Sequence, residues 1–162
     1  MRRIVPGDIV FCKRTGYEHY GIYVGGNRII HYESSIKDKI EGRPKVAETT
    51  IAKFKGEDII FTINPEHLLS FFQDYGLFDE GNYKFYSPSE TVRRAKSKLG
   101  TADYNLLWNN CEHFALWCKT GLATSSQIGT AAEFLISGIP IIGFIINSKR
   151  LEKQIFMEEA QY

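Results

Sequence analysis

Residues 19–31 read HYGIYVGGNRIIH, two β-rich arms on either side of a Gly-Gly-Asn turn. This pattern predicts a β-hairpin, because β-branched and aromatic residues favour strands and glycine favours tight turns. A three-residue loop at 25–27 would pair Gly21 with His31. His19 would then lie diagonal to His31 on the same face of the sheet, roughly 7–8 Å away between backbones. A two-residue loop would place the histidines on opposite faces, so the register decides whether they can act together.

Elements outside the hairpin indicate an α+β domain. Clusters of β-forming residues predict strands at 9–11 and, more weakly, at 58–63. The residues SPSE at 87–90 have the cap, the first-turn proline and the third-position carboxylate of a capping box. A helix should therefore follow, with Gly100 suited to its end.

Composition limits the class of protein. The 162 residues suffice for one domain with a hydrophobic core, and 43% apolar and 24% charged residues are normal for a globular protein. A net charge of +1 gives no electrostatic reason to expect nucleic acid as a partner. Three cysteines without the spacing of a disulfide scaffold favour free thiols in a reducing compartment. Residues 1–8 show no apolar secretory signal, which favours a cytosol-facing protein.

Cys111 is the candidate nucleophile. A helix is expected to start at Asn109 or Asn110, which both suit an N-cap, and to end at Gly121. Cys111 then lies in the first turn, where unpaired backbone N–H groups favour a thiolate. The same groups can bind the oxyanion that forms when a carbonyl is attacked. We therefore expect the pKa of Cys111 to be depressed toward neutrality.

Two of the four histidines can serve this thiol. His19 is expected to take the proton from Cys111 and to return it to the leaving group. His31 would hold the correct tautomer of His19 by hydrogen bonding, as a carboxylate or amide does in other triads. The spacing of the two histidines is by itself weakly specific.

Four short motifs occur together in this chain. They are PGDI at 6–9, HYGIYVG at 19–25, Ile30-His31 and NCEHF at 110–114. Together they resemble the lecithin:retinol acyltransferase-like family, which includes the small phospholipase A/acyltransferases. The resemblance extends from residue 6 to about residue 121, with the middle loosely matched.

The resemblance implies a fold and a reaction. The fold would be an α+β, circularly permuted papain-like domain, with an antiparallel sheet packed on the helix that carries the nucleophilic cysteine. Cys111 would take an acyl chain from a glycerophospholipid, with His19 as general base and His31 as the third member. The chain would then pass to water, an amine or a lysophospholipid. The resemblance implies no cofactor and no metal, and its partners would be the acyl-donor phospholipid and the phospholipid membrane.

Two other functions use the same residues. One is a papain-like peptidase or amidase, because the same triad attacks amides. The other is a non-enzymatic, membrane-tethered binding module. The intact set of one cysteine and two histidines weighs against that module, because packing does not require all three.

The remaining thiols and a third histidine have structural explanations. Cys118 follows Cys111 on the same helical stripe and is expected in the core, as is Cys12 in its strand. His113 points about 200° around the helix from Cys111, which favours a structural hydrogen bond. A zinc site built from Cys111, His113 and the two hairpin histidines is disfavoured, because Cys-x-His spacing on a helix is poor for shared ligation.

Composition changes beyond the last motif. Residues 134–146 carry no charge, and Lys149, Arg150 and Lys153 follow. As a helix the run would span about 20 Å, short of the roughly 30 Å hydrocarbon core, so an interfacial or re-entrant segment fits better than a full span. A buried core helix of this length is the alternative.

These observations predict three parts. They are a catalytic domain at 1–125, a hydrophobic membrane-associating segment at 126–150 and a short charged tail at 151–162. The expected location is cytoplasmic and membrane-associated through the hydrophobic segment.

Overall fold

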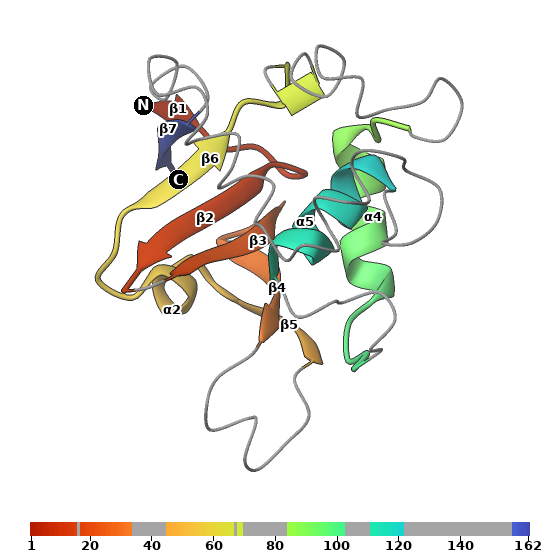
Figure 1. Cartoon of the computed structure of the whole chain (residues 1–162), viewed down its shortest axis with the longest axis horizontal. Coiled ribbons are helices and arrows are strands. Elements are labelled where there is room, and N and C mark those ends of the chain that lie inside the picture. The colour runs from red at the N-terminus through yellow and green to blue at the C-terminus, as the bar shows by residue number, and fades with distance from the viewer. Residues whose placement is uncertain (16, 34–44, 67, 70–83, 103–110, 122–156) are drawn as a thin grey trace.

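The computed structural model describes residues 1–162 apart from 16, 34–44, 67, 70–83, 103–110 and 122–156. The described residues form a mixed sheet and a few helices, an α+β arrangement (Figure 1). The strands are β1 (Arg2–Arg3), β2 (Ile9–Arg14), β3 (Tyr17–Gly25), β4 (Arg28–Glu33), β5 (Lys45–Thr50), β6 (Ile60–Ile63) and β7 (Met157–Gln161). The helices are α2 (Ile51–Lys55), α4 (Pro88–Ser97) and α5 (Cys111–Thr120).

One sheet holds all the described strands, in the order β1-β7-β6-β2-β3-β4-β5. From β2 to β5 each strand pairs antiparallel with the next, and β6 pairs antiparallel with the other side of β2. β1 and β7 run parallel. The sheet is therefore mixed, whereas the family resemblance implied an antiparallel one.

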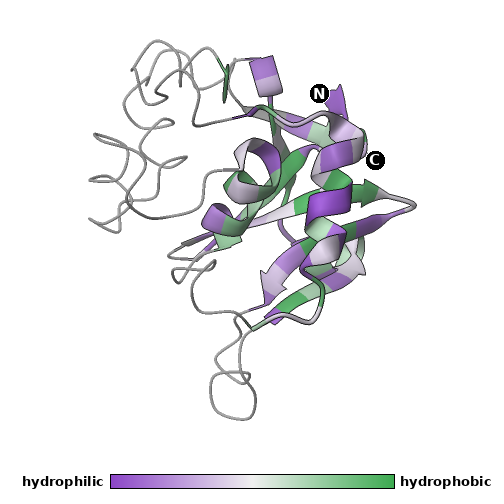
Figure 2. Cartoon of the chain, turned by 90° about the vertical axis from the view of Figure 1, so that its right-hand side faces the viewer, coloured by the Kyte–Doolittle hydropathy of each residue, from purple (hydrophilic) through white to green (hydrophobic). Residues whose placement is uncertain are grey.

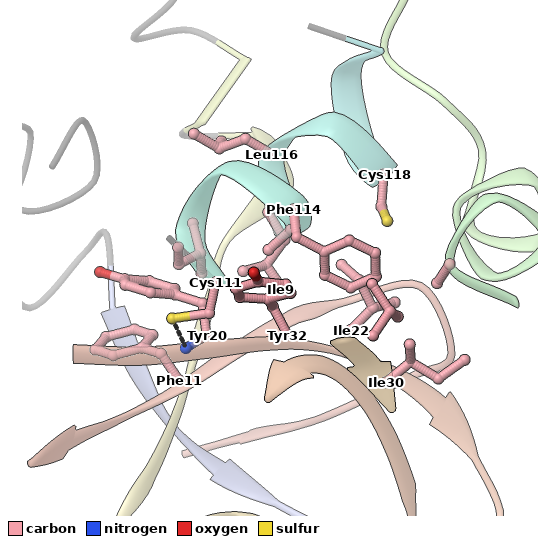
Figure 3. Close-up of a cluster of buried hydrophobic side chains, with 14 of the residues drawn as sticks. Ile9, Phe11, Tyr20, Ile22, Ile30, Tyr32, Cys111, Phe114, Leu116 and Cys118 are labelled. Atoms are coloured by element: carbon pink, nitrogen blue, oxygen red, sulfur yellow. Dashed lines mark hydrogen bonds between the residues drawn. The ribbon is translucent and has the colours of Figure 1, made fainter. Parts of the chain in front are cut away.

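Alternation along the strands sends side chains into two cores, one on each face of the sheet. We call the first the α5-side core, and Figure 3 shows side chains of α5 directed into it. The α2-side core lies on the opposite face. The α5-side core consists of Ile9, Phe11, Tyr20, Ile22, Ile30, Tyr32, Val46, Ile63, Leu68, Ala95, Cys111, Phe114, Ala115, Leu116 and Cys118. The α2-side core consists of Ile4, Val10, Cys12, Ile29, Ile51, Phe54, Ile60 and Ala160.

The β3–β4 hairpin has the predicted pairing of Gly21 with His31, but its turn differs. Gly25 pairs with Arg28, so the turn has two residues, and both have positive φ. A type I′ turn requires that conformation at both central positions. An irregularity between Tyr23 and Gly25 adds the residue that the shorter turn removes. The expectation that a two-residue turn would separate the histidines was therefore wrong, because the bulge restores the register.

The predicted capping box starts α4. Ser87 is the N-cap, and its Oγ accepts a hydrogen bond of 3.3 Å from the backbone N–H of Glu90. Thr91 and Ala95 are the buried residues of this helix. Figure 2, viewed from the α4 side, shows mostly hydrophilic residues on its outward surface. α4 therefore lies over the α5-side core as an amphipathic cover.

The predicted end of α5 is also confirmed. Gly121 has a φ of 71°, and its N–H donates to Trp117 O at 2.9 Å. A Cβ at Gly121 would lie 2.9 Å from a carbon of the Tyr86 ring, so only glycine fits. Asn109 and Asn110, the predicted N-caps, lie outside the described residues.

β7 was not predicted. Its residues, Met157–Gln161, come from the segment expected to be a charged tail, yet they pair with β6 and with β1. The first and last strands of the chain therefore lie side by side, as Figure 1 shows.

The expected location needs a correction. Within the described residues, no helix has the length and apolar character needed to cross a bilayer. The segment at 126–150, through which membrane association was expected, lies outside those residues. The prediction of a location set by that segment is therefore not upheld.

Candidate active site

His19 on β3 and His31 on β4 form a hydrogen-bonded pair. His19 Nε2 lies 3.0 Å from His31 Nδ1, and the two rings are nearly perpendicular at 82°. Gly21 lies between them in the hairpin, where a Cβ would come 2.6 Å from Ile29 Cγ2 and 3.2 Å from His31 Cβ. The absence of a side chain at Gly21 therefore leaves the room in which the rings meet.

Cys111 is the first residue of α5, and its sulfur rests on the backbone of β3. Cys111 Sγ accepts the backbone N–H of Tyr20 at 3.3 Å and lies 3.6 Å from Glu18 O, where its S–H can donate (Figure 3 draws the Tyr20 bond). These backbone groups belong to the two residues that flank His19. The structure thus brings the sulfur to the strand segment that carries the predicted base.

The sulfur takes a position that a paired strand would otherwise fill. The pairing of β3 with β4 begins at Gly21 and His31, so within the described residues the part of β3 before Gly21 has no β4 partner in the register. The N–H of Tyr23 bonds back to Asp8, so the N–H of Tyr20, an odd number of residues away, points to the β4 side. Cys111 therefore reaches the plane of the sheet from the α5 side, whereas the histidines contact Phe54 on the α2 side.

Burial keeps all three groups neutral. Burial raises the pKa of Cys111 to about 11, and the nearby Glu112 carboxylate adds to this, while the Tyr20 N–H acts against it. Burial lowers the pKa of His19 to about 3, with His31 and Arg14 adding to the effect. The expected depression of the Cys111 pKa was therefore wrong, because the loss of water outweighs the start of the helix.

His31 titrates in the same direction as its partner. Burial lowers the pKa of His31 to about 4, a hydrogen bond with the backbone of Tyr32 opposes the shift, and Lys53 and Arg14 add to it. At neutral pH both imidazoles are thus uncharged and the thiol is protonated. An imidazole with so low a pKa, if it acts as a base, would accept a proton as the sulfur attacks and not beforehand.

Phe54 of α2 was missed as a member of this site. Its ring stacks on His19 with centroids 4.7 Å apart and meets His31 edge-on at 5.4 Å. The spacing of Ile51 and Phe54 in the sequence signals a helix face that becomes buried. It carries no signal that the face covers the histidines.

Glu18 and Tyr20 were missed as well. The Tyr20 hydroxyl donates to the Glu18 carboxylate, and this bond spans His19 along the strand. The Tyr20 ring is buried against Phe11, with centroids 5.2 Å apart. Both contacts fix the strand segment on which the Cys111 sulfur rests.

The two remaining cysteines lie in the hydrophobic cores, as predicted. Cys118 and Cys12 are fully buried, and all three cysteines of the chain are free thiols. His113 is buried on α5. In the part of the chain that the structure describes, no three histidine, cysteine, aspartate or glutamate side chains are grouped as metal ligands would be.

The fold and the site together define a class of protein. It is an α+β domain with a cysteine at the start of a helix, next to the strand that carries a hydrogen-bonded histidine pair. The model of the lecithin retinol acyltransferase family matches residues 2–124. The chain therefore belongs to this family.

Curated relatives carry two kinds of name. Lecithin retinol acyltransferase of Mus musculus is 31% identical over 156 residues, which cover 85% of this chain and 62% of the relative. The Homo sapiens protein of that name is 32% identical over 139 residues, covering 75% and 56%. Phospholipase A and acyltransferase 1 of Homo sapiens is 26% identical over 153 residues, covering 86% and 83%. The chain thus spans 56–62% of the length of the lecithin retinol acyltransferases that it matches.

Proposed function

We propose that this protein is a thiol acyltransferase and phospholipase A, with Cys111 as nucleophile, His19 as base and His31 as the residue that orients the base. The observation that carries the proposal is the convergence of two features on one segment of β3. His19 Nε2 and His31 Nδ1 are hydrogen-bonded at 3.0 Å. The Cys111 sulfur accepts the N–H of Tyr20, the residue next to His19, at 3.3 Å. The names of the relatives support an ester of a lipid as the acyl donor.

The protonation states define the first step. In the tautomer that we propose, His19 Nε2 donates its proton to His31 Nδ1 across the 3.0 Å contact, so His19 Nδ1 is left to take the thiol proton. As the proton moves, Cys111 Sγ attacks the ester carbonyl of a glycerophospholipid. Collapse of the tetrahedral intermediate forms a thioester, and His19 returns the proton to the departing lysophospholipid oxygen.

The second step regenerates the thiol. Water, an amine or a lysophospholipid hydroxyl loses a proton to His19 and attacks the thioester carbonyl. The acyl chain leaves on the acceptor, and the proton from His19 returns to Cys111 Sγ. The chain order, histidine strands before the cysteine helix, is consistent with a circularly permuted papain-like domain, which we include in the proposal. The donor would be presented at a phospholipid membrane.

Mass spectrometry after incubation with phosphatidylcholine vesicles tests the proposal directly. We expect an acyl adduct on Cys111 and release of lysophosphatidylcholine in the wild type. C111A should lose both while keeping its circular dichroism spectrum, because the other two thiols, Cys12 and Cys118, are fully buried. C118A is the matched control, because Cys118 lies on the same helix but is fully buried in the core.

The outcomes separate the proposal from its alternatives. A folded C111A protein that still releases lysophosphatidylcholine would show that the mechanism is wrong. Turnover of peptide substrates without turnover of vesicles would replace the acyltransferase with a papain-like peptidase or amidase.

A further inference from the structure

Phe54 contacts both members of the histidine pair with one ring. The ring lies nearly parallel to that of His19, at 29°, and nearly perpendicular to that of His31, at 77°. The two histidine rings are in turn perpendicular to each other. A flat ring in this position restricts rotation of His19 about its side-chain bonds and covers the α2 side of the pair.

Phe54 is itself held firmly by its surroundings. Its side chain is 2% exposed. Its backbone carbonyl accepts a hydrogen bond of 2.6 Å from Arg14 Nη2, and Cys12 Sγ lies 3.8 Å from the same oxygen. α2 is anchored at its start by Thr50, whose side chain accepts from the N–H of Lys53. Because the Phe54 ring is held in place by close packing, it limits the orientations that the neighbouring histidine rings can adopt.

We propose that Phe54 is a positioning residue that holds the His19 ring with Nε2 toward His31 and Nδ1 toward the thiol, and that keeps water from the pair. The kinetic part of this proposal rests on the proposed function, whereas the part that concerns the state of the histidines does not. Phe54 acts only through His19 and His31, without touching the reacting atoms.

The protonation of the pair follows from this cover. The charged groups that act on the two rings are Arg14 of β2 and Lys53 of α2, and the thiol of Cys12 lies beside the same Phe54 carbonyl. Both cations oppose protonation of the histidines, as does burial. Removing the ring should admit water and so weaken the contribution that burial makes.

F54L, which keeps an apolar side chain but removes the flat ring, is the main test. NMR titration of the histidine ring signals, in a C111S background, reports the pair without turnover. We expect both pKa values to rise by more than about one unit in F54L relative to C111S alone. In the active background, kcat should fall about ten- to hundredfold, with KM changed much less. The acid limb of the pH profile should move up with these pKa values, from about 3–4 in the wild type to between about pH 4 and 6 in F54L.

F61L is the matched control, because Phe61 stacks on Phe11 and packs against the α5-side core, on the face of the sheet opposite to Phe54. It should leave the histidine titrations and the pH profile unchanged. F54M provides a milder second variant if F54L does not fold. Unchanged histidine pKa values in a folded F54L or F54M protein would overturn the inference. If the wild type forms no acyl adduct on Cys111, the proposed function is overturned instead.

Discussion

The sulfur of Cys111 is where two physical effects oppose each other. A position at the start of α5 and the N–H of Tyr20 favour a thiolate, while burial and Glu112 favour the thiol. Burial is the largest of these effects. In the proposed mechanism, Cys111 therefore depends on proton removal by His19 during attack and not on a thiolate present at rest.

Alkylation of Cys111 by iodoacetamide should show this dependence. We expect the rate to rise about tenfold per pH unit up to at least pH 9, because the thiolate fraction keeps growing below the pKa of about 11. Peptide mapping by mass spectrometry assigns the label to Cys111, as Cys12 and Cys118 are fully buried. A rate that levels off below pH 8 would contradict the assignment of a protonated thiol.

At the scale of the element, the β3–β4 hairpin sets the distance between the histidines. The bulge near Gly25 corrects the register after a two-residue turn, and Gly21 leaves space beside the His31 Cβ. Gly21 is therefore needed because a side chain there would collide with Ile29 and His31. Gly26 is needed only because the turn requires a positive φ.

G21A should damage the site from within the hairpin. Its Cβ would lie 2.6 Å from Ile29 Cγ2, and the stiff side chain of Ile29 can yield only if the hairpin shifts. We expect a loss of about 1–3 kcal/mol in unfolding free energy and a fall in activity per folded molecule. Urea unfolding and vesicle turnover measure the two effects.

G26A is the comparison for that variant. No atom lies within 4 Å of the Cβ that it would add, but the positive φ of Gly26 still makes it costly, by about 1 kcal/mol. It should therefore lose stability and keep its activity per folded molecule. Equal loss of activity in both variants would argue against a spatial role for Gly21.

At the scale of the whole molecule, burial of two uncharged histidines links stability to pH. The folded pKa values, about 3 for His19 and about 4 for His31, lie below the ordinary value of 6.5. The unfolded chain therefore binds more protons between these limits, so stability is complete above about pH 6.5 and falls as the pH drops toward 4.

Denaturant unfolding at several pH values measures this linkage. Each histidine should contribute a slope of up to about 1.4 kcal/mol per pH unit between pH 4 and 6. The H19Q/H31Q protein lacks both titrations, so its stability should depend less on pH than that of the wild type. Parallel curves for the two proteins would show that the histidines are not buried uncharged.

Much of the fold could be predicted from local sequence. The hairpin at 19–31, the cap at Ser87 and the end of α5 at Gly121 all depend on neighbouring residues, whose turn and capping chemistry acts over a few positions. The same local rules placed Cys111 at the start of a helix. They did not predict the two-residue turn with its bulge, because a bulge changes the register without a characteristic residue that would reveal it in the sequence.

The sequence by itself determined which residues are candidates for the chemistry. It predicted that His19 and His31 share one face, but on a three-residue loop, whereas the structure reaches that register with a two-residue turn and a bulge. Only the tertiary structure decided that Cys111 rests on the outer part of β3, that Phe54 covers the histidines and that β7 joins β1 and β6. It also decided that the thiol and both imidazoles are neutral. The physical reason is that burial and contact between distant segments are sums over the whole folded chain, whereas turns, caps and alternation act between neighbours.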